Sequence, residues 1–189
     1  MKVQALGKHR YLTITSVEIR SESGSWIFPG AMMGIAAGGV FLIFEMIAAG
    51  IMGQSAFEPF RMIAAVILGE GALPAHSTIG LAAVVPVALA IHYALSAFYG
   101  ALFGAAVGAI GTLRSGHVAL VGAASVFGFV LWLANFGAIA PALFPWFLMA
   151  DPAVQFIAHT LFFGTPLGLM LGIRSRGGQK GTRLGSGKV

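Results

Sequence analysis

Residues 26–52 read WIFPGAMMGIAAGGVFLIFEMIAAGIM, a continuous apolar run that contains a single charged residue, Glu45. A helix rises about 1.5 Å per residue, so about 20 apolar residues cross the hydrocarbon core of a bilayer. Three further runs of this kind follow, at residues 81–113, 118–139 and 153–173. The first run is too long for the apolar part of a signal peptide, so we expect a retained span. The pattern predicts four membrane-spanning helices.

The composition of the whole chain agrees with lipid as the solvent. Of its 189 residues, 58% are hydrophobic and 9% are charged, and the mean hydropathy is +0.90. A soluble domain of this length needs more charge to cover its surface. The chain has no cysteine, which excludes disulfides and thiolate chemistry. We predict an all-α, four-helix transmembrane bundle over residues 26–173, a cytoplasmic tail over 1–25 and a basic, disordered C-terminal tail over 174–189.

The segment between the first two spans, Phe57 to Leu68, is apolar but too short to cross a bilayer. Pro59 suits the first turn of a helix. We therefore predict a short interfacial or re-entrant helix on the outer side, with Glu58 and Arg61 paired on its surface. The residues before Trp26 include a short β-like stretch, but a flexible tail is the preferred interpretation.

The basic residues give the orientation of the spans, because cytoplasmic loops carry an excess of Lys and Arg. Ten of the eleven Lys and Arg residues fall in the N-terminal leader, the loop at Arg114 and the C-terminal tail, and Arg61 is the exception. With four spans, these three regions share one side. We expect both termini in the cytoplasm, near anionic lipid headgroups. The same distribution argues against nucleic-acid binding.

Small residues recur every four positions in three of the spans, which places them on one helix face. Such stripes are typical of close helix–helix contact in membranes. The pattern leaves open whether the partner helix belongs to this chain, to another copy or to a larger membrane complex. The predicted packing glycines are Gly30, Gly34 and Gly38, then Gly100, Gly104 and Gly108, and finally Gly164, Gly168 and Gly172.

Each span carries a polar residue: these are Glu45, His92, Asn135 and His159. Ionisable groups in hydrocarbon normally face the bundle interior. Alternating helix directions place these residues at one level, roughly 6–16 Å below the outer boundary. We expect the Glu45 carboxylate to bond one of two imidazoles. The predicted buried polar cluster consists of Glu45, His92, Ser96, Tyr99, Asn135 and His159.

Three interpretations of this cluster remain open. It is a hydrogen-bond network that fixes helix register, or a ligand site, or part of a proton or small-solute path. As a ligand site, His92 and His159 with Glu45 would hold a divalent transition metal, or the two histidines would bind a haem iron. The sequence contains no soluble-enzyme motif and no candidate catalytic residue.

One resemblance adds to this interpretation. The features that carry it are Glu45 late in a Gly-rich first span, His92-x3-Ser96-x2-Tyr99-Gly100 in the second, Asn135 in the third and Ala158-His159 early in the fourth. Over residues 26–176, this arrangement resembles the small bacterial inner-membrane proteins of the YagU type, with Asn135 where some relatives carry histidine. The resemblance implies an inner-membrane location and a link to acid or stress survival.

We therefore expect a non-enzymatic accessory or interaction subunit, or a stress-related membrane component. A metal- or haem-binding membrane protein is the second hypothesis, and a small transporter or proton-conducting oligomer is the third.

Overall fold

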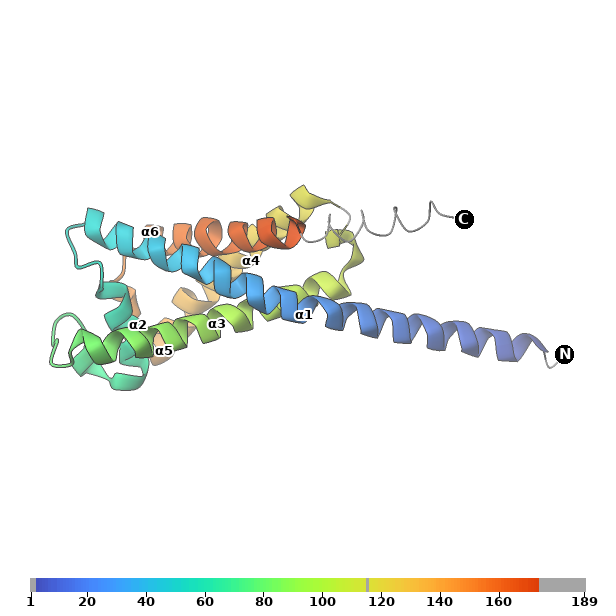
Figure 1. The fold of residues 1–189 in the computed structure, drawn as a ribbon, viewed down its shortest axis with the longest axis horizontal. Helices are drawn as coiled ribbons and strands as arrows, with labels where there is room; N and C mark the ends of the chain where they lie inside the picture. Colours follow the sequence, from blue (N-terminus) through green and yellow to red (C-terminus); the bar gives the residue numbers. More distant parts are fainter. Residues whose placement is uncertain (1–2, 115, 174–189) are drawn as a thin grey trace.

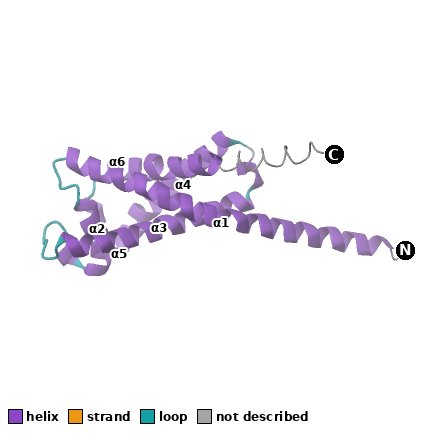
Figure 2. Ribbon diagram, in the orientation of Figure 1, coloured by secondary structure: helices purple, strands orange, loops and turns teal. Residues whose placement is uncertain are grey.

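The computed structural model describes residues 3–114 and 116–173, with side chains from Trp26 onward. The described backbone is helical and contains no strand (Figure 2). Four helical segments are long and apolar enough to cross a membrane: Trp26–Ile51, Leu81–Ala109, His117–Leu143 and Pro152–Ile173. The prediction of an all-α, four-helix transmembrane bundle is confirmed, and the chain is a multi-pass membrane protein.

The elements follow one another with short connections. They are α1 (Val3–Ile51), α2 (Glu58–Leu68), η1 (Glu70–Ala72), α3 (Leu81–Ala109), η2 (Gly111–Arg114), α4 (His117–Ala134), η3 (Asn135–Ile139), α5 (Ala140–Leu143), η4 (Pro145–Met149), α6 (Pro152–Ile157) and η5 (Ala158–Gly164). Residues 165–173 continue the fourth span as α-helix. The predicted disordered tail at 174–189 lies outside the described residues.

The predicted flexible leader is wrong for the backbone from Val3 onward, which forms one helix with the first span. No proline occurs before Pro29, and adding residues to an existing helix avoids the cost of nucleation. Figure 1 shows this part of α1 projecting beyond the other spans. The second span ends at Ala109 instead of Leu113, because the chain is extended at Ile110. The third continues past Ile139 to Leu143.

The glycines of α1 face those of α3. A Cβ added at Gly34 would collide with the backbone of Ser96 and Gly100, and one added at Gly30 would collide with Gly100 and Gly104. The two helices therefore pack backbone against backbone, which only glycine allows. For these two stripes, the helix that each one contacts belongs to this same chain.

The fourth span packs on α4 in the same way. A Cβ added at Gly164 or Gly168 would meet Ala124 and Val121 of α4, and Gly172 faces the His117 ring. Helix α1 joins the two helix pairs through its contact with η5, whereas α3 and α4 make no extensive backbone contact. Gly108 of α3 is also buried.

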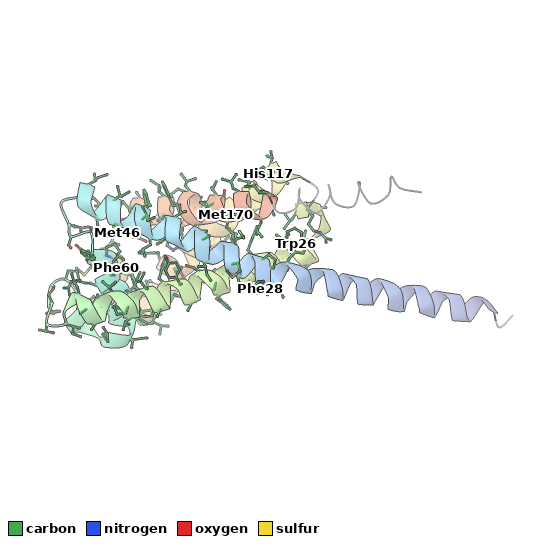
Figure 3. All side chains as sticks on the ribbon, viewed as in Figure 1. Trp26, Phe28, Met46, Phe60, His117 and Met170 are labelled. Carbon is green, nitrogen blue, oxygen red and sulfur yellow. The ribbon has the colours of Figure 1, made fainter. Side chains whose placement is uncertain are left out.

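Two apolar clusters occupy opposite ends of the bundle. One includes Phe103, Leu120 and Leu167, with Trp26 against it, and the other includes Phe60 and Val84, with Met46 against it. In Figure 3, Met46 and Phe60 lie at the end that carries α2, and Trp26 and His117 lie toward the other. The space between the spans is therefore bounded on both sides by packed side chains.

The predicted short helix between the first two spans is present as α2, with Pro59 in its first turn. Its predicted surface pair between Glu58 and Arg61 is wrong. The guanidinium of Arg61 instead donates to the carbonyl oxygens of Ala72 and Ile79, each at 3.2 Å. Both bonds come from Nη1, whose two hydrogens reach one carbonyl each. Arg61 thereby ties α2 to the loop that leads into α3.

Candidate functional site

Two wide helical turns carry polar residues of the site. The third span is π-helical over Asn135–Ile139, and the fourth over Ala158–Gly164. Pro141 and Pro166 follow these segments and cannot donate a backbone hydrogen to the carbonyls four residues earlier. Both of those carbonyls lie inside the π segments. Turns of this kind occur frequently at functional sites.

A chain of hydrogen bonds crosses from α3 through the third span to the fourth. The Tyr99 hydroxyl donates to Asn135 Oδ1 at 3.2 Å. The Asn135 amide nitrogen lies 3.4 Å from Nε2 of His159, and Nδ1 of His159 lies 2.8 Å from the Gln155 backbone oxygen. A carbonyl oxygen only accepts, so the His159 hydrogen is on Nδ1 and its Nε2 accepts from Asn135. Both ring nitrogens of His159 are therefore engaged.

The next bond connects the fourth span to α1. The Gln155 side-chain amide donates to Glu45 Oε2 at 2.8 Å, and these two side chains are only 8% and 7% exposed. The other oxygen, Glu45 Oε1, is buried and has no hydrogen-bond partner among the described residues. The prediction that Glu45 bonds an imidazole is wrong, because Gln155 lies between the carboxylate and His159.

Gln155 is a site residue that the sequence interpretation missed. It stands four residues before His159 in the fourth span, so the two residues share one helix face. That spacing was the available signal. Asp151, just before this span, is its N-cap, since its carboxylate accepts from the backbone nitrogens of Ala153 and Val154.

His92 makes a separate contact with α1. Its Nε2 lies 2.8 Å from the carbonyl oxygen of Gly38, so Nε2 carries the hydrogen. The ring of Phe41 packs against both imidazoles, with centroids 5.5 Å from His92 and 4.9 Å from His159. Within the part of the chain that the structure describes, no group of three His, Asp or Glu residues is arranged to hold a metal ion. The structure therefore does not assemble Glu45, His92 and His159 as a set of metal ligands.

A cavity of about 590 Å³ lies between α1, α2, α3 and the third and fourth spans. All six residues of the predicted polar cluster line it, and so does Gln155. They are Glu45, His92, Ser96, Tyr99, Asn135, Gln155 and His159. Most of the remaining lining is aliphatic or aromatic, including Phe41 and Met62. The cavity thus has one polar wall in an apolar enclosure.

The cavity reaches the lipid-facing surface of the bundle. Three of its lining residues, Ile67, Leu95 and Ile139, are 69%, 46% and 40% exposed. These residues belong to α2, α3 and the third span. They lie on the side of the bundle where α3 and α4 make no extensive backbone contact with each other. Toward the other end of the bundle, the cavity stops at Leu131 and Phe163, which belong to the buried apolar cluster there. The space is a lateral recess.

The sequence matches no protein-family model, and neither curated proteins nor solved structures show significant similarity to it. The interpretation of the site therefore depends on its geometry.

Proposed function

We propose that this membrane protein is a non-enzymatic binding component that takes an amphipathic small molecule from the bilayer into the cavity between its spans. The observation that carries the proposal is a recess with an apolar lining, one polar wall and a rim of lipid-exposed side chains. Its volume falls within the range of small-molecule sites, about 300–1,000 Å³. An apolar tail would occupy the aliphatic and aromatic part, and a polar head would meet the hydrogen-bonding groups.

Binding is favoured over transport because of how the recess ends. A path across the membrane would have to continue past Leu131 and Phe163, where Phe103, Leu120 and Leu167 form a packed apolar core. Polar or water-lined surface is what supports solute or proton movement through a bundle. The hydrogen-bond chain instead connects the helices to one another.

Binding is also favoured over a metal or haem centre. A ligating imidazole needs a nitrogen lone pair, and the two nitrogens of His159 are both in hydrogen bonds. The Nε2 of His92 faces a carbonyl oxygen. Coordination by both histidines would require the network to be rebuilt.

The setting of this function is also a proposal. The distribution of basic residues favours cytoplasmic termini, and the resemblance to YagU-type proteins suggests a bacterial inner membrane and a role in acid or stress survival. As an accessory subunit or stress-related component, the protein would hold its ligand for another membrane process.

The test is to identify what copurifies with the protein. After gentle solubilisation, native mass spectrometry of the full chain is expected to show a bound small molecule that extraction into organic solvent recovers. Replacing cavity-lining Ala94 with tryptophan should displace it. Ala90→Trp, one turn earlier on the exposed surface of α3 and outside the cavity, is the matched control. Equal retention by both variants would contradict the proposal.

A further inference from the structure

The cavity wall has an acidic character. Among the described residues that line the cavity, Glu45 is the only carboxylate, and there is no lysine or arginine. The nearby cation Arg61 is directed away, into its bonds with Ala72 and Ile79. In a medium of low dielectric constant, an anionic head group beside Glu45 would have no compensating charge, and a cationic one would be attracted.

The hydrogen-bond directions lead to the same conclusion. Tyr99 donates its single hydroxyl hydrogen to Asn135, while Asn135 and Gln155 each use one of their two amide hydrogens, toward His159 and Glu45. The carboxylate of Glu45 is left with an acceptor that no donor of the protein reaches. Glu45 Oε1 has no partner among the described residues.

His92 adds a second acceptor to this wall. Its Nε2 hydrogen points to the Gly38 carbonyl, which leaves the Nδ1 of the neutral ring as an acceptor. A head group that donates hydrogen bonds would satisfy these atoms, whereas a head group that only accepts would satisfy none of them.

We infer that the molecule bound in the cavity is an amphiphile with an alkylammonium head, which would donate to Glu45 at the polar wall. This inference rests on the proposed binding function and specifies the chemistry of the ligand. An ammonium group supplies both the positive charge and three hydrogen-bond donors. A long-chain alcohol donates without the charge, and a fatty acid carries the opposite charge.

The experiment compares three probes of one chain length, dodecylamine, dodecanol and dodecanoic acid, by native mass spectrometry of the detergent-solubilised full chain. Dodecylamine is expected to bind at least about tenfold more tightly than dodecanoic acid, with dodecanol between them. In Glu45→Gln, the affinity for dodecylamine should fall about tenfold while that for dodecanol is unchanged. Glu70→Gln, at an exposed position in η1, controls for net charge and should change neither.

A second variant keeps the inference testable if Glu45→Gln does not fold. Leu95→Lys places an ammonium group at the exposed rim of the cavity, and it should abolish the preference for dodecylamine over dodecanoic acid. Binding of the acid as tight as the amine to the unaltered protein would overturn the inference and leave the proposed function standing. An amine preference that survives Glu45→Gln would also overturn it. Failure of all three probes to bind would count against the proposed function itself.

Discussion

Replacing Gln155 with leucine removes the hydrogen bond that connects the fourth span to the carboxylate of α1. Gln155 donates at 2.8 Å to Glu45 Oε2, and Glu45 Oε1 already lacks a partner among the described residues. In the variant, a carboxylate that is 7% exposed would have neither oxygen satisfied. The backbone oxygen of Gln155 would still accept from His159, so the rest of the network would remain intact.

The expected loss in free energy of unfolding is about 3 kcal/mol, because removing the donor leaves a buried carboxylate without a hydrogen bond. The double variant Glu45→Leu and Gln155→Leu should recover to within about 1 kcal/mol of the unaltered protein, since both polar groups are then gone. Because Glu45→Leu alone also leaves a buried amide unsatisfied, the two substitutions should be coupled by at least about 2 kcal/mol.

Reversible unfolding in mixed detergent and sodium dodecyl sulfate, followed by circular dichroism, measures these differences. Gln54→Leu, at an exposed position after α1, is the matched control and should lie within about 0.5 kcal/mol of the unaltered protein. A Gln155→Leu variant that loses less than about 1 kcal/mol, or a double variant whose cost is the sum of the single ones, would refute the reasoning.

Three further predictions concern the elements that hold the site in place. Gly100→Ala should lower the free energy of unfolding by about 1–3 kcal/mol, because the added Cβ meets the backbone of Gly30 and Gly34. Arg61→Met should release the loop between α2 and α3, which limited proteolysis of reconstituted protein would detect as faster cleavage. Asp151→Ala should cost about 1 kcal/mol in the same unfolding assay, because it removes the N-cap of α6.

Each of these variants has its own control in the chain. Gly122→Ala adds a methyl group where no heavy atom lies within 4 Å, so it should not destabilise the bundle. Arg61→Lys keeps the positive charge and hydrogen-bond donors but not the planar guanidinium geometry, so it should protect the loop only in part. Asp151→Asn keeps an oxygen acceptor and should retain most of the cap. If Gly100→Ala proved as harmless as Gly122→Ala, the close approach of α1 and α3 would be wrong.

The polar cluster shows how far residue spacing reaches toward a site. One polar residue in each span, at comparable depth, placed four side chains around the same cavity, and Ser96 and Tyr99 near His92 completed the six. The bonds among them were not predictable, because a hydrogen bond depends on tenths of an ångström and on rotation of the helices. The expected bond between Glu45 and an imidazole proved wrong for that reason, because Gln155 bonds the carboxylate instead.

The sequence alone determined that this chain crosses the membrane four times as helices, because the lengths of its apolar runs match the bilayer and the helix satisfies every backbone group within itself. It also determined that glycine stripes mark helix contacts. Tertiary structure decided that those contacts lie within the chain, that the third and fourth spans widen at Asn135 and His159, and that a lateral cavity opens beside α3. Partner choice and cavity shape follow from how whole helix surfaces fit together, and periodicity along a single helix carries no information about that fit.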